Sequence, residues 1–293
     1  MKFYIVTPTF NALTWLQQCI RSVADQIGEG VEVHHHVQDG CSNDGTRNFL
    51  EHWQSAHANV PGYTFTFNSA KDSGMYDALN ISWSHIPVDA TITAHLNSDE
   101  QYFPGALKAV AELLTAKPET DIILASFIII NANNRYICHK RPILPRKWIS
   151  NASCEIPTCA CFHKVETFIK HGIRFDARFR AIADKELYRH IVNYGVRFAL
   201  LPRVFSSAFT VTGTNLAWMD ASKKDCILLY KEHPELGTWY SRNLPYRYSA
   251  LKRYIKDKFY PAPKSYSLYS PNHDQRTKYT IERPTTRWGV RQA

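Results

Sequence analysis

Apolar positions in the first part of the chain switch regularly between the period of a strand and the period of a helix. Residues 2–6 form a short apolar run, and residues 13–26 then carry apolar side chains at helical spacing. The succession continues with strands expected at 31–38, 63–67, 90–96 and 122–130 and helices at 46–57, 75–83 and 105–116. This alternation predicts an α/β fold with a doubly wound, mostly parallel central sheet and helices on both faces. Ligands of such sheets bind at the strand carboxyl ends, so we expect the polar clusters there to meet in one crevice.

The pattern becomes less regular after residue 131. A strand is expected at 136–140, helices at 164–171 and 184–194, one or two strands within 196–211, and a basic amphipathic stretch at 251–259. A helix at 216–232 is expected to turn Met219, Ile227 and Leu228 inward. Pro, Ser, Thr, Tyr and Arg dominate from Pro261 onward, which predicts an extension without its own core. We therefore expect one domain at 1–240, in two parts that divide at residue 130, and a helical and extended C-terminal segment at 241–293.

Composition and charge describe a folded protein with one unusual end. A chain of 293 residues that is 44% hydrophobic, with 12 Gly and 15 Pro, can bury a full core, which excludes disordered, collagen-like and low-complexity proteins. The formal net charge is +9, and residues 242–293 carry all of it, since twelve Lys and Arg there face three acidic residues. A neutral body argues against a nucleic-acid partner. The basic end suits an anionic membrane surface, and a merely solvated tail fits it equally well.

The basic segment also contains aromatic side chains, which favour the boundary between lipid headgroups and hydrocarbon. Its cations and aromatics lie close together: Lys252, Arg253, Tyr254, Lys256, Lys258, Phe259 and Tyr260. The sequence therefore predicts a reversible membrane contact through 242–293. The competing hypothesis is that 251–260 packs on the body and 261–293 makes a partner or homo-oligomer contact.

Cysteine usage and hydropathy predict a cytoplasmic protein, with the membrane contact placed on the inner face. The apolar run at residues 3–6 is too short for a signal peptide, and the run at 122–130 is too short to span a bilayer. Seven cysteines without a C-x-x-C pair suit reduced thiols. Cys154, Cys159 and Cys161 match no zinc spacing, so buried thiols are favoured over a metal cluster. The histidines at 34–36 alternate along a strand and are not expected to chelate one ion together.

Asp99 and Glu100 directly follow the strand expected at 90–96. A carboxylate fixed at a strand end can ligate Mg²⁺ or Mn²⁺ that bridges a diphosphate. Taken alone, the pair is more often a helix cap or a turn. The stretch at 39–46 is equally ambiguous, because Asp, Asn and Gly are good turn formers.

Five polar segments nevertheless follow one another in a set order and spacing. They are residues 7–11 (Thr-Pro-Thr-Phe-Asn), 39–46 (Asp-Gly-Cys-Ser-Asn-Asp-Gly-Thr), 72–80 (Asp-Ser-Gly-Met-Tyr-Asp-Ala-Leu-Asn), 96–100 (Leu-Asn-Ser-Asp-Glu) and 183–187 (Ala-Asp-Lys-Glu-Leu). Over roughly residues 1–215 the chain thereby resembles the inverting glycosyltransferases of family 2. These enzymes have the GT-A fold and are common in bacterial surface-polysaccharide assembly.

The resemblance implies a nucleoside-diphosphate sugar as donor, bound by residues 1–130, and an acceptor bound by residues 131–240. It implies Asp99 as the metal ligand, for Mn²⁺ or Mg²⁺, in a D-x-D-like motif whose first acidic place is here Asn97. The implied donor-binding residues are Thr7, Pro8, Thr9, Asp39, Asp72, Gly74, Asp77, Asn97 and Ser98. Gly74 would let the backbone approach the ligand closely, and Asp39 would accept hydrogen bonds from the base.

The resemblance also implies that Asp184 is the general base, which takes the proton of the attacking acceptor hydroxyl. An Asp at a helix start is otherwise a cap. Glu186 is the nearby competitor on another helix face, and both His163 and Glu186 are candidates for reaching the acceptor pocket.

The expected reaction is the non-processive transfer of one sugar, with inversion, to a lipid-linked or saccharide acceptor. The Gln-x-x-Arg-Trp motif of processive synthases is incomplete, because Pro284 stands at the Gln place before Arg287-Trp288. A nucleotidyltransferase is disfavoured, since no Gly-rich phosphate loop follows the first strand. A non-catalytic nucleotide-binding or scaffold protein is the alternative from another class.

Overall fold

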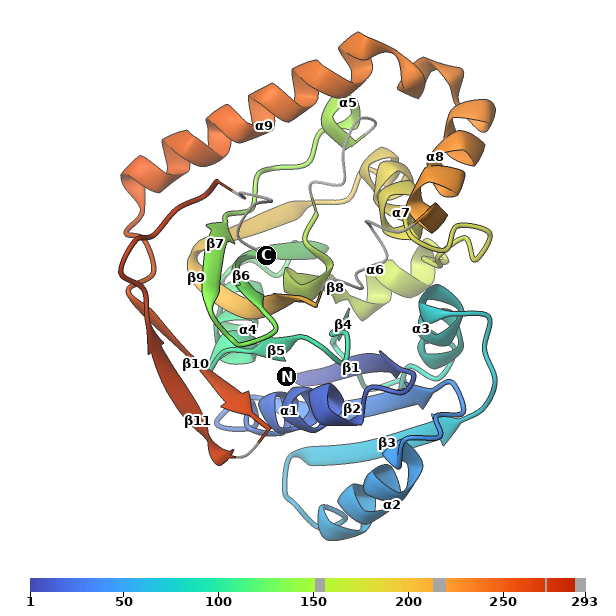
Figure 1. Ribbon diagram of the computed structural model, residues 1–293, viewed down its shortest axis with the longest axis vertical. Coiled ribbons are helices and arrows are strands. Elements are labelled where there is room, and N and C mark those ends of the chain that lie inside the picture. Colours follow the sequence, from blue (N-terminus) through green and yellow to red (C-terminus); the bar gives the residue numbers. More distant parts are fainter. Residues whose placement is uncertain (151–155, 213–219, 272, 288–293) are drawn as a thin grey trace.

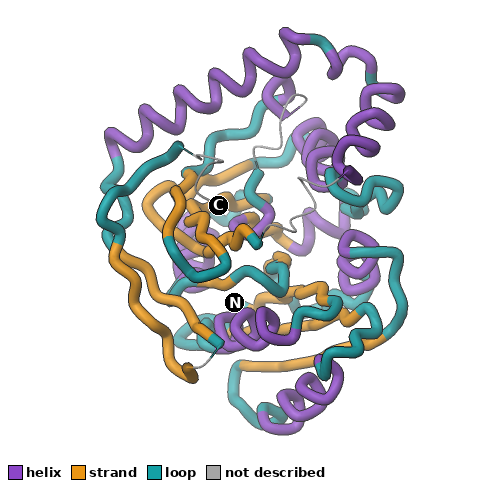
Figure 2. The backbone as a smooth tube through the Cα atoms, viewed as in Figure 1, coloured by secondary structure: helices purple, strands orange, loops and turns teal. Residues whose placement is uncertain are grey.

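The computed structural model describes residues 1–150, 156–212, 220–271 and 273–287 and shows a mixed α/β architecture around one large sheet (Figure 1). Nine strands of these residues pair into that sheet. Their order is β3 (Tyr63–Ser69), β2 (Glu32–Asp39), β1 (Lys2–Thr9), β4 (Ile92–His95), β8 (Cys161–Lys164), β6 (Ile122–Asn131), β9 (Phe198–Val211) and β5 (Gln101–Tyr102), with β7 (Tyr136–Lys140) beside β6. Figure 2 shows most strands of this sheet toward the centre, with helices around them.

The predicted mostly parallel sheet is confirmed. β1 pairs in parallel with β2 and with β4, β2 pairs in parallel with β3, and β6 does so with β9. β5 pairs antiparallel with β9 and β7 does so with β6. In the middle of the sheet, β8 runs antiparallel to both β4 and β6. The sequence analysis missed this strand because four residues are too few to establish a period.

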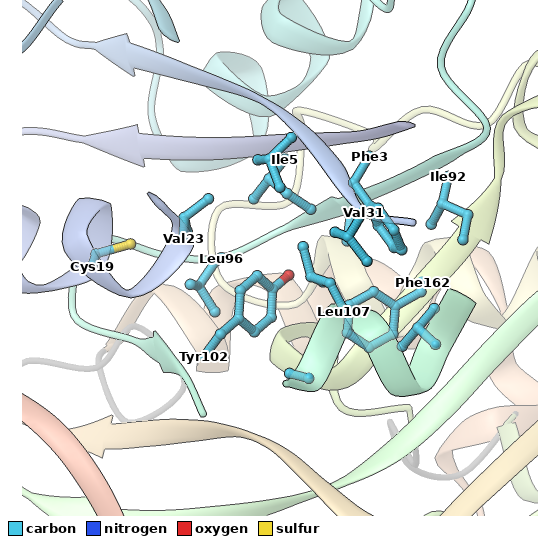
Figure 3. Packing of buried hydrophobic residues seen from close by; sticks show 14 of the residues in the cluster. Phe3, Ile5, Cys19, Val23, Val31, Ile92, Leu96, Tyr102, Leu107 and Phe162 are labelled. Carbon is cyan, nitrogen blue, oxygen red and sulfur yellow. The ribbon is translucent and has the colours of Figure 1, made fainter. Parts of the chain in front are cut away.

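Both faces of β1 are buried, because helices cover the sheet from two sides. Phe3 and Ile5 pack with α1 (Leu13–Ala24), α2 (Thr46–Ala56) and α4 (Ala106–Ala116), as Figure 3 shows in part. The alternate residues Tyr4 and Val6 pack with α3 (Met75–Trp83), α6 (Val165–Lys170) and α7 (Ala183–Ile191). A strand that is apolar on both faces is typical of the centre of a doubly wound sheet.

Helix α8 (Asp220–Glu232) corrects one expectation about inward residues. Leu229 is fully buried and Leu228 packs on the same cluster, but Ile227 is 70% exposed, so its predicted inward position is wrong. Asp225 and Leu229, four residues apart, make the buried face, and the helical period turns Ile227 away from it. Met219 lies outside the described residues.

The C-terminal segment folds against the body. It consists of the long helix α9 (Trp239–Phe259) and the hairpin β10 (Ser265–Ser270) and β11 (His273–Thr280). Leu268 of the hairpin is fully buried in a cluster with Phe103 and Ile128, and Arg276 makes two hydrogen bonds of 2.6 and 2.9 Å to Asp25 of the loop after α1. The predicted domain boundary at residue 240 falls inside α9 and stays a prediction.

Arg141 ties the end of α9 to the sheet. Its guanidinium is fully buried, with Nε donating to Asp257 Oδ1 at 2.8 Å and Nη2 donating to the carbonyl of Pro261 at 2.8 Å. His139 lies 2.9 Å from the same Asp257 oxygen. None of the helices in the described ranges combines the length and apolar character that a membrane crossing requires.

Removing Asp257 tests this connection. Asp257→Ala leaves the buried Arg141 cation without its carboxylate, so we expect a loss of about 3 kcal/mol in the free energy of unfolding, measured by urea denaturation. The control is Asp274→Ala, whose carboxylate pairs with Arg21 but is 93% exposed. It should cost less than about 1 kcal/mol, and equal losses in both variants would contradict the role given to Arg141.

Candidate functional site

One large cleft of about 1130 Å³ opens at the carboxyl ends of β1 and β4 and at the start of α3 and α7. Eight of the predicted site residues line it: Pro8, Thr9, Asp72, Gly74, Asn97, Ser98, Asp99 and Asp184. The other five do not line it, and they are Thr7, Asp39, Asp77, His163 and Glu186. The expected convergence of the polar loops is therefore a feature of the structure.

The loops after β1 and β2 are joined to each other at the cleft entrance. The backbone N–H of Asn11 donates to Ser42 Oγ at 2.8 Å, and the N–H of Asn43 donates back to Asn11 Oδ1 at 2.9 Å. Asn11 and Cys41 both have left-handed backbones, with φ of 48° and 65°. At these two turns the backbone bends away from the ends of β1 and β2, which leaves room for a ligand above the sheet.

Thr7 and Asp39 lie beneath this entrance and are fully buried. The Asp39 carboxylate accepts hydrogen bonds from the hydroxyls of Ser42 and Ser69, at 2.5 and 2.6 Å. Thr7 Oγ1 is 2.9 Å from His35 Nε2. In this arrangement Asp39 holds together the ends of β2 and β3, and its neighbour Gly40 supplies the cleft surface.

The loop before α3 is folded around two carboxylates. Asp72 Oδ1 accepts from the N–H of Gly74 at 2.9 Å, and Asp77 Oδ2 accepts from both the N–H and the hydroxyl of Ser73 at 2.9 Å. Gly74 has φ 126° and ψ 179°, a conformation that is essentially restricted to glycine. Burial, with Asp77 and Asp39 nearby, raises the pKa of Asp72.

A tight turn follows β4, and its adjacent residues Asp99 and Glu100 have different surroundings. Glu100 is buried, and its Oε2 accepts from the N–H of Asn97 at 2.8 Å, so it closes the turn while Asp99 lines the cleft. Burial raises the pKa of both carboxyls, and the Asp99 charge raises that of Glu100 further. The raised pKa values mean that negative charge is less favourable at this turn than in water, and a bound cation would offset this effect.

The donor atoms at this turn suit a hard divalent cation. Asn97 Oδ1 is buried without a hydrogen-bond partner among the described residues, and both Asn97 and Asp99 line the cleft. The described part of the chain holds no group of three or more acidic, His or Cys side chains placed to bind a metal. One or two protein oxygens are nevertheless what Mg²⁺ uses when substrate phosphates complete its shell.

Asp184 lines the cleft from the first turn of α7. Its Oδ1 accepts from the Tyr76 hydroxyl at 3.3 Å and from the Lys185 N–H at 2.8 Å. Asp225 of α8, a residue that the sequence analysis missed, fixes the chain just before it: one buried carboxylate oxygen accepts from the N–H groups of Ala181 and Ile182, at 2.6 and 3.2 Å. No local sequence signal marks Asp225, because its partners are more than 40 residues away.

Glu186 and His163 are not brought into the cleft. Glu186 pairs with Arg189 and His190, both at 2.8 Å, and lines a separate polar pocket of about 330 Å³ on the other side of α7. His163 is buried in β8, 3.3 Å from the Tyr188 hydroxyl. Beside it, Cys161 is a buried thiol. Cys154 lies outside the described residues.

Several cleft residues escaped the sequence analysis although they neighbour or lie within its motifs. They are Phe10, Asn11, Trp15, Lys71, Tyr76 and His95. Two signals were available: Tyr76 belongs to the segment 72–80, and Lys71 directly precedes it. Lys71, Asp72, Asp99 and Asp184 are the charged residues of the described lining, so acidic groups outnumber the cation.

Comparison with known proteins adds a family and a fold. Residues 4–200 match the family model "Glycosyl transferase family 2". No curated protein sequence matches the chain. Among solved structures, S. aureus TarS 1–349 superimposes with a TM-score of 0.56 at 16% identity, over 78% of this chain and 66% of that one.

Two further structures hold ligands. S. aureus TarS 1–349 in complex with UDP-GlcNAc has a TM-score of 0.56 at 17% identity, over 78% of this chain and 67% of that one. The mannosyltransferase PcManGT from Pyrobaculum calidifontis, in complex with GDP-Man and Mn²⁺, has a TM-score of 0.58 at 17% identity, over 86% and 69%. The match spans only 40% of a longer TarS structure. At these identities the likeness shows the fold.

The buried His163 predicts a pH effect on stability. Burial and the neighbouring His95 lower the pKa of His163 to about 3, so only the unfolded chain takes up this proton as the pH falls below the ordinary value of 6.5. Acidification should therefore destabilise the fold. His163→Gln should weaken this pH dependence by about 1–3 kcal/mol in urea titrations between about pH 7 and pH 4. His52→Gln, at an exposed position, is the control and should behave as wild type.

Proposed function

Because the chain belongs to glycosyltransferase family 2, we propose that it transfers one sugar, with inversion and with the help of a divalent cation, from a nucleoside diphosphate to a lipid-linked or saccharide acceptor. The enzyme has the GT-A fold and is a glycosyltransferase. The observation that carries the finer proposal is that Asp99 and Asp184 line one cleft from different elements, the turn after β4 and the start of α7. A metal ligand and a base on separate elements can act on the leaving group and on the acceptor.

The donor would bind over the strand ends. The UDP-GlcNAc of TarS and the GDP-Man of PcManGT support a nucleotide sugar. Pro8, Thr9, Gly74 and Ser98 line the cleft there, while Thr7, Asp39 and Asp77 would act from behind the surface by holding the loops. Among the described residues that line the cleft, Lys71 is the cation that would face a diphosphate.

The charge of the cleft supports metal dependence. Asp72, Asp99 and Asp184 outnumber Lys71, so a diphosphate would meet like charges unless a cation came with it. Asp99, with the Asn97 side-chain oxygen, would hold Mn²⁺ or Mg²⁺, as the Mn²⁺ of PcManGT suggests. Such a cation, when bound, neutralises negative charge that develops on the leaving diphosphate.

Asp184 would take the proton from the acceptor hydroxyl as that oxygen attacks the anomeric carbon. Tyr76 and the Lys185 N–H bind its Oδ1, and Asp225 fixes the preceding backbone, so the carboxylate is held in one orientation. A positioned base is effective because no reorganisation is needed at the moment of proton transfer.

The incomplete Gln-x-x-Arg-Trp motif supports the transfer of a single sugar rather than processive synthesis. Pro284 occupies the Gln place, and Trp288 lies outside the described residues. We further propose that the enzyme acts in polysaccharide assembly, in the cytoplasm and at the inner face of a membrane.

Asp184→Asn tests the base. The amide keeps the shape and an oxygen acceptor but cannot take up a proton, so kcat should fall by about 10²–10⁴-fold. Donor binding, measured by calorimetry, should stay near wild type. The matched variant is Glu186→Gln in the neighbouring polar pocket, which should retain most of kcat. A larger loss in Glu186→Gln than in Asp184→Asn would move the base to Glu186.

Asp99→Asn tests the metal ligand. Removal of the anionic oxygen should abolish most of the extra thermal stabilisation that Mn²⁺ adds to UDP or GDP binding, because a bound ligand raises the melting temperature according to its affinity. Asp89→Asn, far from the cleft on the surface, is the control and should shift with Mn²⁺ as wild type does. Unchanged Mn²⁺ dependence in Asp99→Asn would remove Asp99 from the metal site.

A further inference from the structure

Helix α9 has one side fixed to the body of the protein. Pro245 and Ser249 are buried, and Lys256 Nζ donates to the carbonyl of Pro142 at 2.6 Å. Asp257 turns toward Arg141, and Arg253 Nε donates to the Arg141 carbonyl at 3.4 Å. The acidic residue of the helix and two of its cations therefore lie on this inward side and bind the body.

The opposite side of α9 carries a stripe of exposed apolar side chains. Leu244 is 53% exposed, Leu251 56%, Tyr254 55% and Ile255 38%. Leu251 follows Leu244 by seven residues, and Tyr254 and Ile255 follow Leu251 by three and four, which places all of them on one face of a helix. Figure 1 shows α9 along the outer edge of the molecule, with α5 (Lys147–Ser150) on its inner side. Single exposed apolar residues are normal, but an aligned series marks an interaction surface.

The charges on this outward side have one sign. Arg247, Lys252 and Lys258 are exposed, and the sequence of α9 contains a single acidic residue, the inward Asp257. Lys258 Nζ lies 4.8 Å from the centre of the Tyr254 ring, and Lys252 Nζ 5.5 Å from that of Tyr248. Lysines that extend past aromatic rings keep their charge at the edge of an apolar surface.

The cations of the C-terminal segment outside α9 differ in their surroundings. Arg276 binds Asp25 of the body, whereas Lys264, Lys278, Arg283 and Arg287 are exposed. The positive charge of residues 242–293 is therefore distributed over several surfaces. The exposed cations of α9 lie beside the apolar stripe.

We propose that the outward face of α9, formed by Leu244, Arg247, Leu251, Tyr254, Ile255 and Lys258, lies flat on an anionic phospholipid bilayer. An in-plane helix needs an apolar face for the acyl boundary and cations for the lipid phosphates, and this face has both. A second copy of the chain is disfavoured as occupant, because two such faces would repel each other. The membrane contact itself is argued from α9 alone. Its role, which is to bring the cleft to a lipid-linked acceptor, rests on the proposed function.

Vesicle sedimentation with the full chain tests the proposal. We expect the protein to pellet with vesicles of phosphatidylcholine and phosphatidylglycerol, to pellet poorly with phosphatidylcholine alone, and to be released by high salt through screening. Leu251→Asp and Lys258→Glu should each lower the partition constant by at least about fivefold. Substitutions on exposed residues change the surface and should leave the melting temperature near wild type.

Matched variants on other surfaces are the controls. Ile227→Asp replaces an apolar side chain that is 70% exposed on α8, and Lys108→Glu reverses an exposed charge on α4. Both should bind vesicles as wild type does. Three results would overturn the proposal: no vesicle binding by the intact chain, equal losses in the α9 and control variants, or a change in oligomeric state in Leu251→Asp without a change in vesicle binding.

The outcome is separable from the test of the proposed function. Nucleotide binding with Mn²⁺, measured by thermal shift, should be the same in wild type, Leu251→Asp and Lys258→Glu, because α9 is outside the described cleft lining. Vesicle binding without nucleotide binding would contradict the enzyme proposal alone. Nucleotide binding without vesicle binding would contradict the α9 proposal alone.

Discussion

The candidate site depends on the register of three parallel strands. β1 pairs with β2 so that Thr9 lies opposite Asp39, and with β4 so that Val6 lies opposite His95. The carboxyl ends of all three strands therefore face the same edge of the sheet, and each chain leaves the sheet there in a sharp turn. Burial of β1 on both faces fixes this register, since a slip by one residue would exchange the two sets of apolar side chains.

Carboxylates dominate the chemistry of that edge, and each has a different task. Asp39, Asp77 and Glu100 accept hydrogen bonds from hydroxyl and backbone N–H groups and thereby stabilise the loops. Asp72, Asp99 and Asp184 line the cleft. Because burial raises the pKa of Asp72 and of Asp99 and so makes their ionisation less favourable, the cleft is better suited to a cation with its anionic ligand than to an anion alone.

The C-terminal segment shows the same division between structure and surface. Its acidic Asp257 and the cations Arg253 and Lys256 are directed at the body around Arg141. The hairpin that follows completes a small core with Phe103 and Ile128 and is tied to the end of α1. The segment is thus part of the folded body, and its exposed apolar stripe with flanking cations lies on one side of α9.

The sequence by itself determined the family, the alternation of strands and helices, and the positions of the loops that form the cleft. These features are local: the run at residues 2–6 is apolar on both sides, and the motif at 72–80 carries its own turn and helix start. Tertiary structure alone decided which side chains face the cleft. Asp184 lines it while Glu186, two residues away, lines another pocket, Asp39 is covered by Ser42 and by Ser69 from the neighbouring strand, and Asp225 reaches back more than 40 residues. Periodicity assigns residues to faces of an element, but the element that packs on each face, and the partners it brings, are set by contacts between distant parts of the chain.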